Sequence, residues 1–447
     1  MIQWIFLTSD LLFYILLLFV VFYLFLVYRH DHLKKIWISI FRNPLAILSF
    51  TVVVLYLTIA LLDSLHFIVL KDIFGFKADP YTVHSMLDVS LMPLPIVSEE
   101  TYAAPLSTHL YQKEWIVNAF GKMQQTFIPL NYAPILIKSK GVDILQRFSL
   151  GAMWGLSYAF LIWICCAAIT RRLNPFGSAI RKSFFISTLL IVTFSGGIVE
   201  LAHAYHVMGT NKIGEDIFYI AIKSIRTGVL MGSLTTLLML PLAIIAAIPA
   251  GYWGGWIDDI VQFIYITLSS IPGVLLIAAS ILAMQIYVSA HPQLFVTSTT
   301  RADARLLTLC AILGLTSWTT LCRIIRAETL KLREADFVLA AKAMGKRSIS
   351  IMLHHILPNI SHLVLVTVVL EFSALVMAEA VLTYIGVGVD PNMYSWGNMI
   401  AAARLELARE PVVWWPLMSA FALMFIFILA INLFADNVRK GFSPRER

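Results

Sequence analysis

The sequence predicts an all-α membrane protein, a polytopic helical bundle of about nine transmembrane helices with a small extracytoplasmic insertion. Of the 447 residues, 59% are hydrophobic and only 13% are charged, whereas soluble domains carry about 25% charged residues. Apolar runs of spanning length recur from residue 11 to residue 435, and a membrane helix needs about 20 mostly apolar residues. The lipid bilayer is therefore the expected solvent of most of the chain.

Nine segments have the length and composition of spanning helices. They cover residues 11–28, 44–62, 148–169, 183–199, 227–252, 260–287, 306–322, 360–386 and 413–435. Pro241 and Pro272 lie inside the fifth and sixth segments. Because proline lacks a backbone N–H, we expect both residues to kink their helices.

A stretch of about 85 residues, 63–147, separates the second predicted span from the third. Its six prolines and interspersed charges oppose a further spanning helix,. It nevertheless holds enough aromatic residues to pack a small core or to lie on the membrane surface, namely Phe67, Phe74, Tyr102, Trp115, Phe120 and Phe127. We therefore predict a small, loop-rich folded appendage outside the membrane.

The distribution of basic residues predicts the orientation of the chain. A net charge of +7 and a pI near 9.1 could suit nucleic acid, but the Lys and Arg residues are scattered between apolar runs and no nucleic-acid partner is expected. With a cytoplasmic C-terminus, the cytoplasmic stretches would hold 19 of the 33 Lys and Arg residues in about half the length of the external ones,. This bias favours an external N-terminus.

The segment 333–358, READFVLAAKAMGKRSISIMLHHILP, is polar and basic and lies between two predicted spans. Ala340, Ala341 and Lys342 are good helix formers, and Gly345 followed by two cations would end a short helix,. A short amphipathic helix on the cytoplasmic side is suited to transmit a push from another protein. We call residues 333–358 the coupling loop.

The coupling loop resembles the hallmark loop of ABC importer permeases, which reads E-A-A, three residues, Gly, nine residues, I-x-L-P. Ala340-Ala341, Gly345 and Leu357-Pro358 match this spacing, whereas Leu339 stands in place of the Glu and His355 in place of the Ile. The resemblance implies contact with an ATPase through Arg333, Glu334, Asp336, Ala340, Ala341, Lys342, Gly345, Leu357 and Pro358.

Further motifs resemble the C-type permease subunit of dipeptide/oligopeptide importers. They are the external H-x-M-G-T-N-x-x-G-E-D signature at 206–216, the G-Y-W-G-G-W-I-D turn at 251–258, E-A-V-L-T-Y-I-G-V-G-V at 379–389, S-W-G-N-M at 395–399 and N-L-x-x-D at 432–436. Asn211 and Glu215 depart from the family's usual Asp and Arg. The matches cover roughly the last 55 to 60% of the chain.

The resemblance implies four parts: N-terminal helices at 1–62, the insertion at 63–147, additional transmembrane helices at 148–203 and a permease core at 204–447. The core belongs to a six-helix permease whose first helix is either the second span, after Arg42-Asn43-Pro44-Leu45-Ala46, or the fourth. The resemblance places the chain in the bacterial inner membrane. It implies as partners a homologous B-type permease, two ABC ATPases that bind ATP and Mg²⁺, and an extracytoplasmic substrate-binding protein. No cofactor is expected in this chain.

Alternatives remain for substrate and mechanism. An ABC permease could serve nickel chelates or another solute instead of peptides. Glu371 and Glu379 lie in an apolar segment, where a charge is costly and often functional,, so a stand-alone secondary transporter or channel could use them as a proton site. In the permease interpretation they are candidate residues of the translocation path. No catalytic residue is predicted. No metal site is predicted either, because the adjacent side chains of His354 and His355 would project from a helix in different directions and could not bind one metal ion,.

Overall fold

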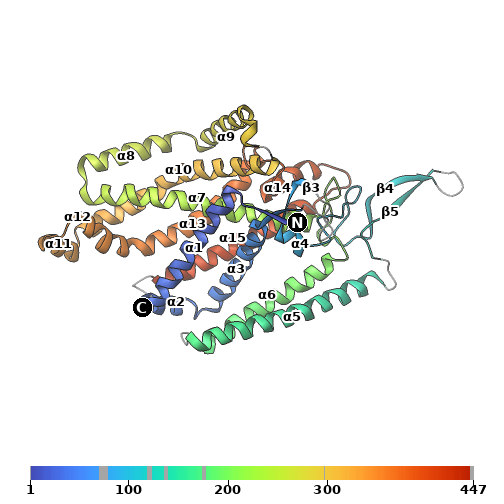
Figure 1. Cartoon of the computed structure of the whole chain (residues 1–447), viewed down its shortest axis with the longest axis horizontal. Helices are drawn as coiled ribbons and strands as arrows, with labels where there is room; N and C mark the ends of the chain where they lie inside the picture. The colour runs from blue at the N-terminus through green and yellow to red at the C-terminus, as the bar shows by residue number, and fades with distance from the viewer. Residues whose placement is uncertain are drawn as a thin grey trace. The chain divides into compact units, whose positions relative to one another are not determined.

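The computed structural model describes residues 2–69, 79–117, 123–134, 139–173, 178–295 and 297–442, most of them helical (Figure 1). The chain divides into two compact units. Unit 1 comprises Met1–Phe6, Phe41–Gly228 and Tyr394–Ala430, and unit 2 comprises Leu7–Ile40, Val229–Met393 and Ile431–Arg447. Helices α7 (Ile217–Trp253) and α15 (Trp415–Phe442) contribute to both units.

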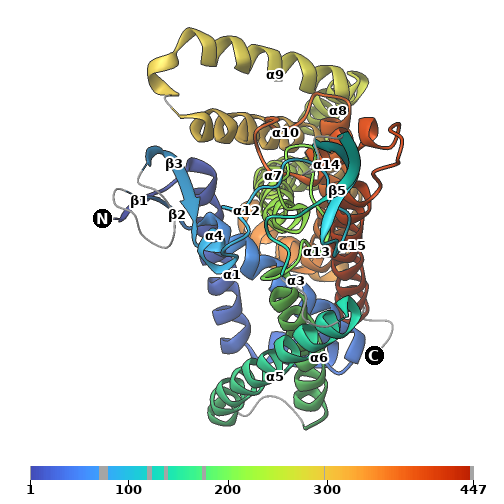
Figure 2. The ribbon, with the colours of Figure 1, turned by 90° about the vertical axis from the view of Figure 1, so that its right-hand side faces the viewer.

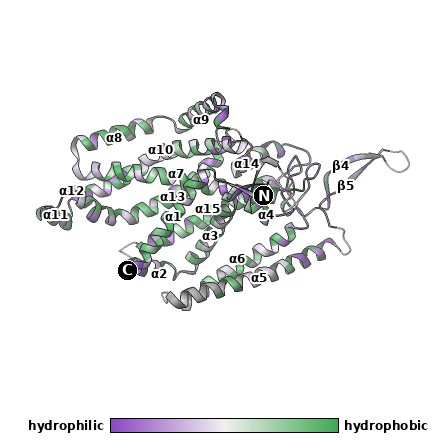
Figure 3. Cartoon of the chain, in the orientation of Figure 1, coloured by the Kyte–Doolittle hydropathy of each residue, from purple (hydrophilic) through white to green (hydrophobic). Residues whose placement is uncertain are grey.

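Eight helices of the described part are long and apolar enough to cross a membrane, which confirms a polytopic helical membrane protein. Figure 3 shows hydrophobic residues along α1, α7 and α8. The eight candidates are Thr8–Arg29, Pro44–Ser64, Ile180–Ala202, Ile217–Trp253, Gly273–Ala290, Ser298–Arg333, Leu363–Tyr384 and Trp415–Phe442. The third predicted span lies in α5 (Lys140–Leu173), whose side chains beyond residue 164 are outside the described set.

The sixth predicted span, 260–287, breaks at Pro272 into two helices instead of forming the single kinked helix that the sequence predicted. The chain forms α8 (Gly255–Ser270) and α9 (Gly273–Ala290), and it bends between them (Figure 1). Pro272 is the N-cap of α9 and has no N–H to continue α8,. A 3-10 turn, Pro292–Leu294, follows α9. Pro241, by contrast, lies inside the continuous helix α7.

Unit 2 contains the first two helices of the chain as well as most of the predicted core. Its other elements are α1 (Thr8–Arg29), α2 (Asp31–Ile40), α10 (Ser298–Arg333), α11 (Asp336–Ala343), α12 (Ser348–Ile351), a π-helical turn (Met352–Ile356) and α13 (Leu357–Tyr384). At the start of α1, Thr8 Oγ1 donates to Asp303 Oδ2 of α10 at 2.6 Å. The Trp37 ring of α2 stacks on Phe434 of α15 with centroids 6.4 Å apart.

Unit 1 is held by aromatic packing around α3 (Pro44–Ser64). Asn43 caps this helix and Pro44 occupies its first turn, a combination that favours helix initiation,. Tyr56 stacks on Phe427 of α15 at 4.8 Å, and Trp396, the first residue of α14 (Trp396–Glu406), packs against Phe427. These rings join helices that are distant in sequence.

The insertion is more ordered than the predicted loop-rich appendage. It contains β2 (His66–Val69), β3 (Asp79–Ser85), α4 (Met86–Ser90), β4 (His109–Val117) and β5 (Met123–Pro129). Strand β1 (Ile2–Ile5) completes an antiparallel β1-β2-β3 sheet, and β4 pairs with β5. Of the six predicted aromatics, Phe67 and Tyr102 are buried, Trp115 and Phe127 are exposed, and Phe74 and Phe120 lie outside the described residues.

Helices α5 and α6 (Ser178–Ala202) form an antiparallel hairpin within unit 1 (Figure 2). Glycines line the contact: a Cβ on Gly151 would lie 2.4 Å from the Gly196 carbonyl oxygen, and one on Gly155 would lie 2.6 Å from the Val192 carbonyl oxygen. Such small residues allow close backbone approach in membrane helices. Helix α6 also packs on α3.

Candidate functional site

The coupling loop begins with α11, which is anchored on one face. Val338 and Ala341, three residues apart, are both buried and pack in a cluster with Ile248 of α7, Ile325 of α10 and Ile356. Residues three apart lie on the same side of a helix. The short helix is therefore fixed through this side to α7, α10 and the π-helical turn before α13.

The stop predicted at Gly345 is confirmed. Gly345 has φ +73°, a left-handed conformation that glycine adopts without strain. Its N–H donates to the Lys342 carbonyl at 3.0 Å and the Lys346 N–H donates to the Ala341 carbonyl at 3.2 Å. These two bonds constitute a Schellman motif, which satisfies the last carbonyls of α11.

Apolar side chains on either side of the buried stripe of Val338 and Ala341, and on the cap of α11, are exposed. Phe337 is 43% exposed, Leu339 45% and Met344 72%, so apolar side chains face outward beside the exposed Lys342. The predicted coupling residues fall into three groups: Glu334, Asp336, Ala340, Lys342, Gly345 and Pro358 are exposed, Arg333 and Leu357 are half-buried, and Ala341 is buried. Ala341 therefore holds the helix in place rather than presenting a side chain to a partner.

The coupling loop ends in a π-helical turn that leads into α13. Pro358 lies in the first turn of α13, where its missing N–H is tolerated,. Next to this turn, Lys346 Nζ and His355 Nε2 are 3.2 Å apart. The Leu-Pro end of the motif thus fixes the point at which the loop re-enters a spanning helix.

An ion pair that the sequence motifs alone did not reveal braces the site. Asp258, the last residue of the G-Y-W-G-G-W-I-D turn, accepts two hydrogen bonds from the Arg326 guanidinium of α10, one of them Nη2 to Oδ2 at 2.6 Å. These bonds hold the pKa of Asp258 below its ordinary value. Gly251 brings α7 close to α10, since an added Cβ would lie 2.7 Å from Thr329 Cβ. The turn therefore supports the helix from which the coupling loop departs.

Both predicted path residues lie on α13, in different environments. Glu371 is half-buried. Glu379 is 1% exposed and accepts a hydrogen bond from Thr383 Oγ1 at 2.9 Å. Thr383 in turn accepts from the Val389 N–H at 3.4 Å. This chain of contacts ties Glu379 to the end of α13, which favours a structural role over a ligand role.

The signature segment 206–216 forms a compact loop before α7 in unit 1. His206 Nδ1 lies 2.6 Å from Asp216 Oδ2, and both side chains are 1% exposed. Asp216 Oδ1 also accepts from the Tyr219 N–H at 3.0 Å, which caps the first turn of α7. The described residues contain no group of three or more His, Cys, Asp or Glu side chains placed to hold a metal ion.

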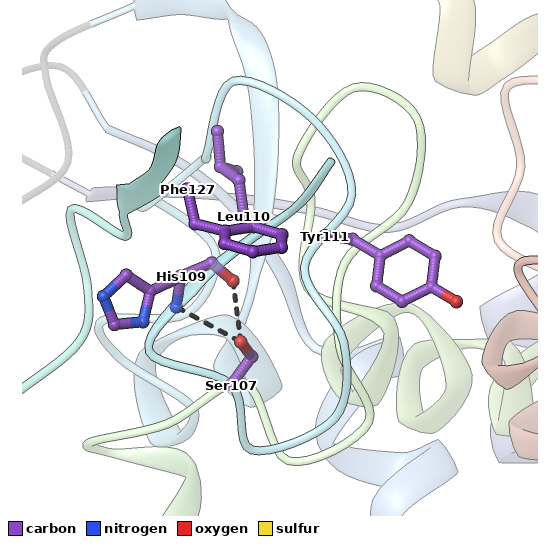
Figure 4. Close-up of a pocket in the computed structure, with 5 residues that line it drawn as sticks. All are labelled: Ser107, His109, Leu110, Tyr111 and Phe127. Carbon is purple, nitrogen blue, oxygen red and sulfur yellow. Dashed lines mark hydrogen bonds between the residues drawn. The ribbon is translucent and has the colours of Figure 1, made fainter. Parts of the chain in front are cut away.

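A groove of about 590 Å³ lies at the base of the β4–β5 hairpin (Figure 4). Ser107, His109, Leu110, Tyr111 and Phe127 line it, and Ser107 Oγ donates to the His109 carbonyl at 2.7 Å. The hairpin register is irregular between His109 and Lys113. Its lining carries no convergent charged groups, so it defines no chemistry by itself.

The described residues thus combine spanning helices with a coupling loop that is anchored on one side and exposed elsewhere. Residues 239–447 match the family described as "Binding-protein-dependent transport system inner membrane component". The chain belongs to this family and is a transmembrane permease subunit of an ABC importer, as the coupling-loop resemblance predicted.

Curated relatives support this assignment over 242 residues, 54% of the chain. A putative peptide permease protein of Brucella suis is 30% identical, with 73% of its length covered. The "Dipeptide transport system permease protein DppC" of Alkalihalophilus pseudofirmus is 28% identical with 73% covered. The "Oligopeptide transport system permease protein OppC" of Mycobacterium bovis is 26% identical with 77% covered.

Proposed function

We propose that this subunit forms half of the path of an importer for dipeptides or oligopeptides, with its N-terminus outside and its C-terminus in the cytoplasm. The substrate class is supported by the names of the relatives, which are oligopeptide, peptide and dipeptide permeases. A homologous B-type permease would supply the other half of the path. Two ATPase subunits would bind ATP and Mg²⁺, and an extracytoplasmic binding protein would deliver the peptide.

The observation that carries this proposal is the coupling loop. Helix α11 is packed into unit 2 through Val338 and Ala341, while Phe337 and Leu339 beside this contact and Met344 at the cap are exposed. A partner that binds these exposed side chains would move α11 together with the long helices to which it is anchored. Movement of an ATPase could thereby change the accessibility of the path.

Cysteine crosslinking tests the assignment. In a cysteine-free background, we expect Leu339→Cys to crosslink to a co-purified ATPase subunit, because that side chain is exposed. Ala341→Cys is the matched control, since it lies two residues away and is buried. Labelling of Leu339→Cys by an impermeant reagent from outside intact cells would refute the orientation. Absence of any ATPase crosslink in the assembled complex would refute the coupling role.

A stand-alone secondary transporter is not favoured. It would use Glu371 and Glu379 as a proton site, but Glu379 is bound to Thr383 at the end of α13. Family membership also places the energy source in separate subunits. ATP-dependent uptake that persists after a proton ionophore collapses the proton gradient would separate the two mechanisms.

A further inference from the structure

Residues 99–111 of the insertion, here called the strut, are woven into the signature loop. Ala103 N–H donates to Thr210 Oγ1 at 2.6 Å, and the Thr210 N–H donates back to the Ala103 carbonyl at 3.0 Å. Thr210 Oγ1 also donates to the Thr101 carbonyl at 2.9 Å. Two further backbone bonds, Glu99 N–H to Gly214 O and Leu106 N–H to His206 O, extend the contact.

Both glycines of the signature are needed for this contact. Gly209 and Gly214 have φ of +74° and +78°, a region that other residues rarely adopt. A Cβ on Gly209 would lie 2.5 Å from the Ala103 carbonyl oxygen, and one on Gly214 would lie 1.8 Å from the Glu99 carbonyl oxygen. The signature glycines therefore leave the space that the backbone of the strut occupies.

Glu99 lies at the centre of the contact and is 6% exposed. Its carboxylate accepts hydrogen bonds from the Asn131 N–H at 3.0 Å and the Tyr132 N–H at 2.9 Å. Its Oε1 also faces His206 Nε2 at 3.6 Å, a distance for electrostatic contact rather than a hydrogen bond. Because His206 Nδ1 is bound to Asp216, Glu99 and Asp216 hold the imidazole ring from opposite sides.

The other side of the strut reaches α14 and α15. Tyr102 Oη donates to Glu406 Oε1 at the end of α14 at 3.2 Å. The Tyr111 ring meets the Trp415 ring edge to face at 4.8 Å, and Trp415 Nε1 donates to the Thr210 carbonyl at 3.0 Å. One segment of the insertion thus fastens the start of α7 to the start of α15.

We propose that the strut is a working part of the permease, and that Glu99 is a positioning residue that acts through His206 to hold the signature loop. This inference rests on the proposed function, because the signature lies on the side that would receive the binding protein. The strut keeps residues 206–216 in one shape, so that docking of the binding protein is transmitted to α7 and α15. The strut is therefore more than the loop-rich folded appendage that the sequence predicted for the whole insertion.

Glu99→Ala tests the proposal, with Glu100→Ala as the matched control because Glu100 is the exposed neighbour of Glu99. Each variant would be purified with its ATPase subunits in nanodiscs, and ATP hydrolysis measured with and without the binding protein loaded with trialanine. We expect Glu99→Ala to retain basal ATP hydrolysis, whereas its stimulation by the loaded binding protein should fall at least fivefold. Glu100→Ala should behave as wild type, and Glu99→Gln, which keeps one acceptor oxygen, should recover part of the loss.

Hydrogen exchange supplies a readout that needs no partner. Amide exchange across residues 206–216 of the purified full chain should rise at least tenfold in Glu99→Ala and stay unchanged in Glu100→Ala. Equal exchange in both variants, or wild-type stimulation in Glu99→Ala, would overturn the proposal. So would a proportional fall of basal and stimulated hydrolysis, which would make Glu99 a stability residue. A wild-type complex that the binding protein does not stimulate would instead refute the proposed function.

Discussion

Replacing Gly345 by leucine should weaken binding of the ATPase subunit while leaving the helices inserted. Gly345 has φ +73° and no atom lies within 4 Å of the position that its Cβ would occupy. The cost is therefore conformational rather than steric. A non-glycine residue in the left-handed region costs about 1 to 2 kcal/mol, which corresponds to a change of roughly 5- to 30-fold in an equilibrium constant.

The assay is titration of purified ATPase subunits onto the permease in nanodiscs, with affinity as the readout. Gly345→Asn should lose less affinity than Gly345→Leu, because asparagine tolerates the left-handed region. Gly386 offers a matched control at the end of α13. It has φ +91°, open space at its Cβ position and the same Schellman pair of hydrogen bonds, so Gly386→Leu carries similar strain away from the coupling loop.

The expected order of ATPase affinity is wild type, then Gly345→Asn, then Gly345→Leu, with Gly386→Leu near wild type. If Gly345→Leu bound the ATPase as tightly as wild type, the Schellman stop would have no part in docking. If Gly386→Leu lowered the affinity equally, the effect would be one of general stability.

Three further predictions concern the ion pairs of the two units. Lys223 Nζ lies 2.6 Å from Asp88 Oδ1, and breaking a buried pair lowers the free energy of unfolding by about 3 to 5 kcal/mol. Lys223→Met should therefore lower the thermal unfolding temperature. Adding Asp88→Asn, which removes the charge left unpaired, should restore part of the loss. Burial alone would raise the pKa of Asp88, but Lys223 and hydrogen bonds from Ser85 and Tyr219 hold it below its ordinary value. This stabilisation is present above the unfolded pKa, about 3.9, and is lost as pH falls through the lower folded pKa, so acid unfolding scans should show a flatter profile for Asp88→Asn. Arg326→Met should lower the free energy of unfolding by about 1.5 to 3 kcal/mol, because it leaves Asp258 without its charged donor,. It should also reduce ATP-coupled uptake more than Lys331→Met does, because the Lys331–Glu328 pair is largely exposed.

The features that sequence could predict are those set by local physics. Hydropathy located the spanning helices because a membrane helix satisfies its own backbone within one segment. The helix at 336–343 and its stop at Gly345 followed from helix formers and a glycine cap,. The contacts of Ala341 did not follow, because its burial depends on α7, α10 and α13 packing around it.

Features that depend on distant partners could not be predicted. Strand β1 at residues 2–5 pairs with β2 at residues 66–69. Because these short strands are far apart in the sequence, neither carries a local signal that identifies its partner. In the sequence, nothing distinguishes Glu99 from the other charged residues of the insertion. Its position beside His206 is set by the tertiary fold. In the sixth span, Pro272 gave a local signal for a kink, but the sequence did not show that the helix would end at Ser270 and begin again at Gly273.

The division of α8 from α9 leaves two short helices in this part of unit 2. At 1.5 Å per residue, the 16 residues of α8 and the 18 of α9 extend about 24 and 27 Å, each short of a hydrocarbon core of about 30 Å. Around the bend, Thr267 Oγ1 donates to the Phe263 carbonyl and Ser270 Oγ to the Thr267 carbonyl, both at 2.7 Å. These hydroxyls satisfy backbone oxygens next to the break. In membranes of different thickness, we expect two short helices joined by a bend to change their mutual angle, whereas an unbroken span would tilt as a whole.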